Sequence, residues 1–170
     1  MKPLPIPEAL ARKYPEWVMW VITVDADGTP NIMPAGWCMI CNATPLMLAV
    51  AVGMGRYTHT CLEDTAEFIL AFPGEGQEGL IEQCGSCSGR DTDKFEKFGL
   101  EMEEATEVNV PLISGCPVAF ECQVVSQIEL EDHSIFIGEV VAAHGAEDAL
   151  GKLENFAGHY AVAQPKTTPG

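Results

Sequence analysis

One short stretch of the sequence combines two kinds of reactive side chain. Residues 84–95 read CGSCSGRDTDKF, in which Cys84 and Cys87 stand at positions i and i+3. Thiols at this spacing are typical of redox dithiols and of metal sites. The residues that follow are of the types that bind small anions through backbone amides, hydroxyls and cationic side chains. They are Ser88, Gly89, Arg90 and Lys94. The stretch therefore predicts either thiol chemistry or an anion site.

A second candidate anion site lies upstream, in GMGRYTHTCLED at residues 53–64. Two glycines end an apolar segment there, and Thr60 followed by Glu63 has the spacing of a capping box. The pattern predicts a helix that begins near Thr58 or Thr60. The amides of a first helical turn and the positive end of the helix dipole favour a phosphate, and Arg56 adds a full charge.

The thiols also permit a metal-site interpretation. Cys38 and Cys41 form a second pair of the same spacing, and four such cysteines are a set that binds zinc or an iron–sulfur cluster. In an extended segment, however, residues i and i+3 point to opposite faces, so this pair holds one metal only if the strand bends there. A redox dithiol at Cys84 and Cys87 stays open as an alternative, although no thioredoxin-like βαβ pattern surrounds it. Core or loop thiols are the default interpretation.

No other motif predicts metal binding or nucleophilic catalysis. The four histidines lack the mutual spacing of a metal site, and no serine lies in a nucleophile elbow. We therefore expect no metal and assign no catalytic side chain. A bound organic cofactor fits better, because it brings its own reactivity and requires only a phosphate site and an apolar slot for a ring.

The charge composition limits the partners of the protein. The chain has 25 acidic against 9 basic side chains among its 170 residues, a formal net charge of −16. Long-range repulsion therefore opposes binding to nucleic acid or to an anionic membrane. Only four basic residues occur between positions 14 and 151, namely Arg56, Arg90, Lys94 and Lys97. A phosphate bound in so negative a protein needs these few cations.

The length and the apolar content of 47 % suffice for one domain with a real core. No apolar run is long enough for a membrane helix, and three prolines stand where a signal peptide would have its apolar stretch. The seven cysteines, an odd number, are expected to be reduced thiols. We expect a cytoplasmic protein with a single domain at 1–170, including an N-terminal arm at 1–16 and a C-terminal extension at 145–170.

The first third of the chain is predicted to form strands. WVMWVITV at 17–24 is apolar and β-branched, and it ends in the turn signal DADGTP. Residues 31–41 are a second extended segment, interrupted at Pro34 and Gly36, and LMLAVAV at 46–52 is a third. These segments predict a three-stranded meander.

Short helices and further strands follow. A helix is expected from Gly79 to Cys84, and another through Phe98 with Asp91 or Thr92 as its cap. The further strands are predicted at 67–72, 117–130 and 135–144, the last two as a long antiparallel hairpin. A small closed or partly closed β-barrel with a few helices is the simplest assembly, because closure removes exposed strand edges.

Four motifs follow one another along residues 17–144: TVDADGTPNIMPAGW, GRYTH, CGSCSGRDTDKF, and EC followed by DHSIFIGEV. Their order resembles the flavoredoxin branch of the flavin-reductase-like, FMN-binding split-barrel family. The resemblance implies a mainly β fold, a six-stranded antiparallel Greek-key split barrel. It also implies a homodimer, one FMN per subunit at or near the dimer interface, and electron transfer or reduction of flavin by NAD(P)H.

The resemblance also implies roles for single residues. The stretch that grips the FMN phosphate corresponds to Arg56, Tyr57 and Thr58, and the loop beside the cofactor to Ser88, Gly89, Arg90, Asp93, Lys94 and Phe95. The segment along the isoalloxazine ring corresponds to Asn31, Ala35, Gly36, Trp37 and Cys38. Asp132 and His133 match the reversal before the penultimate barrel strand, where the histidine is sometimes on the nicotinamide side. Cys84 and Gly85 are then scaffold, whereas Cys87 is not required by the motif.

Two functions from different classes follow from this resemblance. In the first, the protein is an oxidoreductase that passes electrons from NAD(P)H through bound FMN to an acceptor, with the chemistry at the N5 atom of FMN. In the alternative, the protein is an electron-transfer module whose FMN is reduced by a partner redox protein, and the net charge of −16 would suit a basic partner. A relative that binds FMN without turnover is a third reading, and the sequence does not rank the donors or acceptors.

Overall fold

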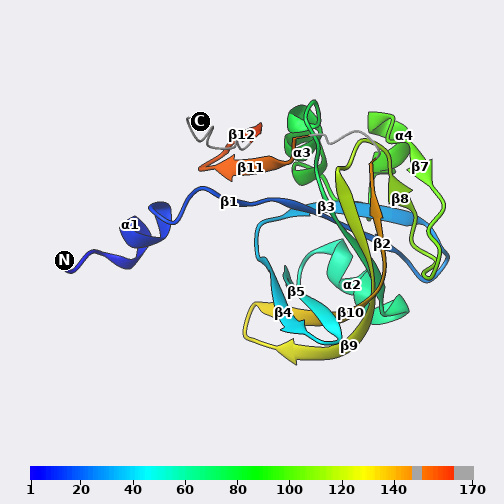
Figure 1. Cartoon of the computed structure of the whole chain (residues 1–170), viewed down its shortest axis with the longest axis horizontal. Helices are drawn as coiled ribbons and strands as arrows, with labels where there is room; N and C mark the ends of the chain where they lie inside the picture. The colour runs from blue at the N-terminus through cyan, green and yellow to red at the C-terminus, as the bar shows by residue number, and fades with distance from the viewer. Residues whose placement is uncertain (147–150, 163–170) are drawn as a thin grey trace, which may run out of the picture.

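The computed structural model describes residues 1–146 and 151–162 of the chain. These residues form four helices and mostly antiparallel strands (Figure 1), so the predicted mainly β fold with a few helices is confirmed. Among the described residues, no helix is long and apolar enough to cross a membrane.

The main sheet of the described chain has seven strands in the order β3-β2-β6-β9-β10-β5-β4, and every neighbouring pair is antiparallel. Its strands are β2 (Met19–Val24), β3 (Pro30–Ala35), β4 (Cys38–Ala43), β5 (Leu46–Gly53), β6 (Glu67–Phe72), β9 (Val118–Glu129) and β10 (His133–Gly145). The long hairpin predicted near the C-terminus is confirmed as β9 and β10, and β6 has the predicted bounds.

The predicted three-stranded meander is wrong, because residues 31–41 form two strands instead of one. β3 and β4 lie at opposite ends of the strand order and are joined by Gly36 and Trp37 alone. Pro34 has no N–H to donate to a neighbouring strand. Space at Gly36 is tight, because a Cβ there would lie 3.0 Å from Glu16 Oε1. The two edges of the sheet therefore meet at this link without pairing, which leaves the barrel split and gives seven strands where six were expected.

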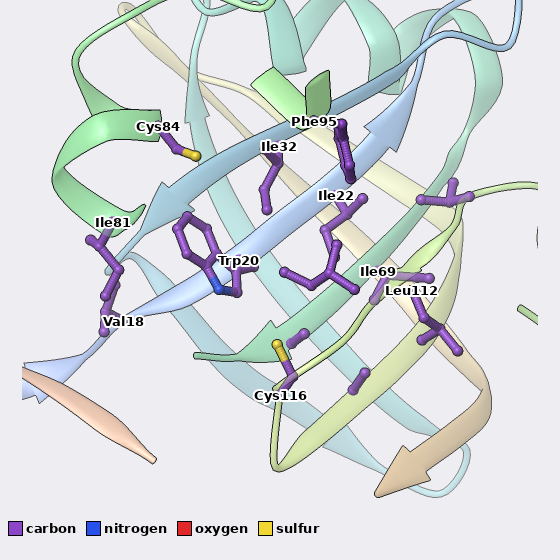
Figure 2. Packing of buried hydrophobic residues seen from close by; sticks show 14 of the residues in the cluster. Val18, Trp20, Ile22, Ile32, Ile69, Ile81, Cys84, Phe95, Leu112 and Cys116 are labelled. Carbon is purple, nitrogen blue, oxygen red and sulfur yellow. The ribbon is translucent and has the colours of Figure 1, made fainter. Parts of the chain in front are cut away.

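Both faces of the sheet are buried, in two separate apolar clusters. Strand β2 is buried at all six positions, and its side chains alternate between the clusters. Trp20 and Ile22 belong to the first cluster, which includes Ile81 and Cys84 from α3 (Glu78–Gly85) and Phe95 from α4 (Lys94–Phe98), as Figure 2 shows. Met19 and Val21 belong to the second, with side chains from β5, β6 and α2 (Tyr57–Thr65).

The predicted helix start near Thr58 is confirmed, whereas the cap of the last helix differs from the predicted one. Helix α2 begins at Tyr57, and its N-cap residue Arg56 makes no side-chain capping bond. Helix α4 is capped by Asp93, whose side chain accepts from the Glu96 amide, and not by Asp91 or Thr92. The short helix predicted at 79–84 is present as α3.

The shorter elements lie at the two ends of the chain and in the segment before β9. Helix α1 (Ile6–Ala11) belongs to the predicted N-terminal arm, and β1 (Glu16–Trp17) pairs with β11 (Leu153–Phe156), which pairs with β12 (His159–Val162). β7 (Met102–Glu103) pairs with β8 (Leu112–Ile113). Of the predicted C-terminal extension, residues 147–150 and 163–170 lie outside the described part.

A buried carboxylate ties the segment around 106–108 to the barrel. Glu121 on β9 is fully buried and accepts hydrogen bonds from the amides of Thr106, Glu107 and Val108 at 2.7 to 3.0 Å. The Thr106 hydroxyl and His144 Nε2 also lie within hydrogen-bond distance of it, at 2.9 and 2.5 Å. Burial alone would raise the pKa of Glu121, but these hydrogen bonds outweigh it and lower the pKa to about 2.

Candidate functional site

A cavity of the described chain lies where the split of the barrel meets two helix ends. Its volume is about 470 Å³, within the usual range for small-molecule sites. Its walls come from β3, the link between β3 and β4, the end of β5, the start of α2, the loop between α3 and α4, and the start of β10. Segments from distant parts of the sequence therefore meet in one pocket.

The floor of the pocket is a buried network of amide and hydroxyl groups. Asn31 Nδ2 donates to Thr23 Oγ1 at 3.1 Å and to Thr58 Oγ1 at 2.9 Å. All three residues are buried, so the Asn31 amide is held in one orientation. Because the Thr58 oxygen accepts from Asn31, the hydroxyl hydrogen of Thr58 is left to be donated elsewhere.

The start of α2 opens into the pocket beside a cation. The turn before the helix is fixed by hydrogen bonds from the Arg56 amide to Gly53 O at 2.9 Å and from the His59 amide to Arg56 O at 3.0 Å. No side chain caps this helix, so its first amides and the positive end of its dipole are available to an anion. The Arg56 side chain is exposed at the pocket wall. This end of the pocket suits a phosphate.

Tyr57 is held in position by a hydrogen bond to Asp25, which is not part of the pocket wall. The Tyr57 hydroxyl donates to Asp25 Oδ2 at 2.8 Å, which raises the pKa of Tyr57 to about 12, so the phenol stays protonated. The Arg90 guanidinium lies over the Tyr57 ring, 5.5 Å from its centroid. Arg90 therefore supports a wall residue and is not itself part of the pocket wall.

Lys94 lies at the base of the pocket with its charge already engaged. Its Nζ donates to Ile32 O at 2.9 Å and to Cys84 O at 2.7 Å, and the residue is buried. Burial lowers the pKa of Lys94. The side chain therefore joins the end of α3 to β3, and this contact sets the shape of the pocket.

Another part of the pocket wall carries an aromatic pair. The His133 and Trp37 rings lie 4.8 Å apart between centroids, tilted by 34°. Asp132 Oδ1 lies 2.8 Å from His133 Nδ1, and because a carboxylate accepts, Nδ1 carries the hydrogen and Nε2 is the acceptor in the neutral ring. A Cβ added at Gly53 would lie 3.5 Å from His133 Nε2 and 3.7 Å from Arg56 Cγ, so the pair lies close to the cation of the pocket wall.

The thiols near the pocket have different surroundings. Cys84 is fully buried, and Figure 2 shows its sulfur directed from α3 into the first apolar cluster. Burial raises the pKa of Cys84 to about 11. Cys87 is half-buried at the pocket wall, with its sulfur 3.6 Å from Gln83 O. All seven cysteines are free thiols.

The structure brings most of the residues singled out from the sequence to this one pocket. Its wall contains Asn31, Ala35, Gly36, Trp37, Arg56, Tyr57, Thr58, Ser88, Gly89, Lys94 and His133. Five are placed elsewhere. Arg90 stacks on Tyr57, and Cys38 packs against the second apolar cluster. Phe95 lies in the first apolar cluster, Asp93 caps α4, and Asp132 accepts from His133. In the described residues, no three His, Cys, Asp or Glu side chains cluster as metal ligands.

Several wall residues were not among the predicted site residues. They are Met33, Pro34, Ala51, Gly53, Gly55, Cys84, Gly85, Ser86 and Cys87. The glycines at 53 and 55 carried a signal, because they end an apolar strand directly before the cationic helix start. The apolar residues carried none, since nothing in their type distinguishes a pocket wall from a core.

Comparison with known proteins agrees with this geometry. Residues 11–164 match the flavin reductase like domain family. The chain belongs to that family. One relative in the flavin reductase like family is an uncharacterized protein of Archaeoglobus fulgidus, 37 % identical over 117 residues. The match covers 68 % of this chain and 66 % of the relative.

Solved structures of similar proteins have the same fold. Flavoredoxin of Desulfovibrio vulgaris superposes with a TM-score of 0.85 at 27 % identity, covering 99 % of this chain and 97 % of that one. An FMN-binding protein of Thermus thermophilus superposes with a TM-score of 0.84 at 26 % identity, covering 100 % of this chain and 97 % of that one. The fold is therefore that of the FMN-binding split-barrel proteins.

Proposed function

We propose that this chain binds one FMN in the 470 Å³ pocket and acts as an oxidoreductase that takes electrons from NAD(P)H and passes them to an acceptor. FMN supplies a ring that accepts and releases hydride or single electrons, so the protein needs to bind, orient and shield it. Family membership and the similarity to an FMN-binding protein support a flavin as the ligand.

The observation that carries the proposal is the combination of groups in the pocket wall. Arg56 stands at an uncapped helix start, and the hydroxyl of Ser88 lines the same pocket, which suits a phosphate. The rings of Trp37 and His133 also line the pocket, and they suit a flat conjugated ring. A phosphate and a flat ring are the two parts of FMN.

The remaining proposed contacts follow from the pocket wall. Asn31 and Thr58 would face the ligand with amide and hydroxyl groups, and the link Ala35, Gly36 and Trp37 would run along the ring. We propose that His133, which lines the pocket and bonds Asp132, contacts the second substrate. Cys38 and Arg90 act only through the residues that they contact.

The test is an anaerobic reduction experiment on purified protein reconstituted with FMN. We expect one FMN per chain, yellow colour, and bleaching of the flavin absorbance when NADH or NADPH is added. A protein that cannot be reconstituted with FMN would refute the proposal at its first step. A protein that binds FMN but is bleached only by a reduced carrier protein would support the alternative function, an electron-transfer module.

The family resemblance also implies a homodimer with FMN near the subunit interface, and we include this in the proposal. The half-exposed pocket residues Trp37 and Ser86 are consistent with a wall completed by a second subunit. The mass of the FMN-bound protein, measured by light scattering during size-exclusion chromatography, tests this part on its own.

A further inference from the structure

The N-terminal arm, residues 1–16, has an apolar face that the described part of the chain leaves exposed. Its helix α1 has no buried residue, and Ile6 and Leu10 are 83 % and 54 % exposed. The two side chains lie four positions apart, on the same face of the helix. A helix of six residues is not stable in water by itself, so this helix needs a surface to pack against. Figure 1 shows the arm projecting away from the barrel.

The barrel has an apolar groove that the side chains of residues 1–146 and 151–162 leave open. The groove is a cavity of about 100 Å³ whose lining side chains are all apolar, and its walls include Trp17, Met39, Ile40, Leu46, Phe72 and Phe120. A buried water needs about 10–15 Å³ of space and two to four polar partners. The groove has the space, but its apolar lining supplies no polar partner. Met39 and Ile40 are 56 % and 58 % exposed at its rim. An apolar side chain therefore suits the groove better than water does.

The groove lies next to the point where the arm leaves the barrel. Trp17 is the second residue of β1 and also a wall of the groove. The arm of the same chain leads away from this wall, so its own Ile6 and Leu10 do not enter the groove. Leu10 is seven residues from Trp17, a reach of up to roughly 25 Å for an extended chain. That reach is enough to bring Leu10 into the groove of a second copy placed against this face.

Charge favours the same arrangement. The arm has three basic residues against Glu8 and Glu16, whereas the rest of the chain has six basic against 23 acidic residues. Two barrels of this charge repel each other, but the arm of one copy is attracted to the barrel of the other. The arm is therefore the part of the chain best suited to approach a second copy.

We propose that two copies of this chain exchange their N-terminal arms, and that Ile6 and Leu10 of each arm pack into the apolar groove of the other copy. Occupation of the groove would cover Met39 and Ile40 on β4. This strand directly follows Trp37 of the pocket wall, so the exchanged arm would also steady that wall. The inference does not depend on flavin binding.

Cross-linking of a mixture of unlabelled and isotope-labelled protein tests the exchange directly. Protein with natural nitrogen and protein labelled with nitrogen-15 are unfolded, mixed and refolded together, then treated with a reagent that joins amines to thiols. Cys41 is exposed on β4 beside Ile40, and Lys13 lies in the arm. We expect cross-linked peptide pairs that join Lys13 or Lys2 to Cys41, in which one peptide is light and the other carries nitrogen-15. Pairs of a single isotope only, or modified Cys41 without any such pair, would overturn the proposal.

A double variant provides the matched comparison. Ile6→Asp with Leu10→Asp should remove the mixed pairs and raise the dissociation constant of self-association at least about tenfold, since two apolar side chains lose their burial. Glu8→Gln, a change on the same helix that leaves both apolar side chains, should keep the mixed pairs. Neither change touches a residue that is buried within its own chain, so both variants should keep the secondary structure of the barrel, measured by circular dichroism. Wild-type protein that sediments as a monomer, or a double variant with unchanged mixed pairs, would refute the exchange.

Discussion

Gly89→Ala should weaken FMN binding strongly while leaving the fold largely intact. A Cβ at this position would overlap Asn31 Oδ1, and it would come within 3.0 Å of Asn31 Cγ and 3.1 Å of Tyr57 Cδ1. Asn31 cannot retreat easily, because it is buried and donates to Thr23 and Thr58. The loop that carries Gly89 is more exposed, and its hydrogen bonds at Ser88 are local ones to Arg90 and Asp91. The loop is therefore the part that moves.

The size of the effect follows from this displacement. The loop has to retreat by roughly 1 Å to restore ordinary van der Waals separations. A hydrogen bond lengthened by that amount passes beyond 3.5 Å and is lost. One lost charge-assisted bond to a phosphate contributes about 1.5–3 kcal/mol, which is a rise of roughly ten- to a hundredfold in the Kd for FMN. The free energy of unfolding of the unliganded protein should fall by less than about 1 kcal/mol, because the Asn31 network stays in place.

Titration of the protein with FMN, followed by flavin fluorescence, and urea unfolding of the unliganded protein measure the two quantities. Gly55→Ala is the matched control, since Gly55 lines the same pocket and an added Cβ there meets no atom within 4 Å. Its Kd should stay close to that of the wild type. If Gly89→Ala bound FMN as tightly as the control, the argument that this close approach shapes the pocket would be wrong.

Three further predictions concern single side chains. Arg56→Ala should raise the Kd for FMN roughly ten- to a hundredfold and that for riboflavin, which lacks the phosphate, much less; equal losses in flavin titrations would show a structural role. Glu121→Gln should lower the free energy of unfolding by about 3 kcal/mol. Because the pKa of Glu121 in the folded protein is depressed to about 2, the stability that its carboxylate contributes is present above about pH 4.5 and is lost as pH falls through 2. Urea unfolding measured as a function of pH checks this. The control is Glu67→Gln, which removes the charge of a more exposed carboxylate that accepts from the same segment, and its free energy of unfolding should change little. In the native protein, mass spectrometry after N-ethylmaleimide treatment should find Cys87 modified well before the buried Cys84, and equal rates would contradict the core position of Cys84.

The elements that the sequence predicted well are those whose pattern is local. β6 is a run of apolar residues between turn signals, and β9 and β10 are long β-branched segments around a polar reversal, so alternation and breakers define their ends. The start of α2 was also predicted from local signals, and it lies one residue before Thr58. The turn that Arg56 makes with Gly53 begins the helix at Tyr57, ahead of the capping spacing of Thr60 and Glu63.

The pairing of strands was not predictable in the same way. The segment 31–41 is extended on both sides of Gly36, so its pattern alone cannot show that β3 and β4 belong to opposite edges of the sheet. The long-range partners β6 and β9 separate them, and such partners leave no trace in the local spacing. The split of the barrel, which forms one side of the pocket, is therefore a tertiary feature.

Among the site residues, the position of Cys38 could have been foreseen. Side chains alternate along a strand, so if Trp37 faces the pocket, its neighbour faces away, and Cys38 does pack in the second apolar cluster, where burial raises its pKa to about 12. Arg90 is different, because its contact with Tyr57 depends on how the loop folds over α2. Within 84–95, residues 84 and 85 were expected to be scaffold and the matching residues of 88–95 to form one loop beside the cofactor. The structure divides the side chains of that loop among the pocket, the core and the outer wall.

The position of Lys94 changes how the pocket must recognise an anion in so acidic a protein. Four cations could be counted in the central part of the sequence. Lys94 is bonded to two carbonyl oxygens, Arg90 lies over the Tyr57 ring, and Lys97 is not part of the pocket wall. Of these four, Arg56 is the one in the pocket wall with an exposed side chain, so the backbone amides of α2 and the hydroxyls must supply the other donors. Amides and hydroxyls are held in place by the fold, and the buried bonds of Lys94 are among those that hold it. The charge of Lys94 thus acts on the ligand indirectly, through the position of the loop that it ties to β3.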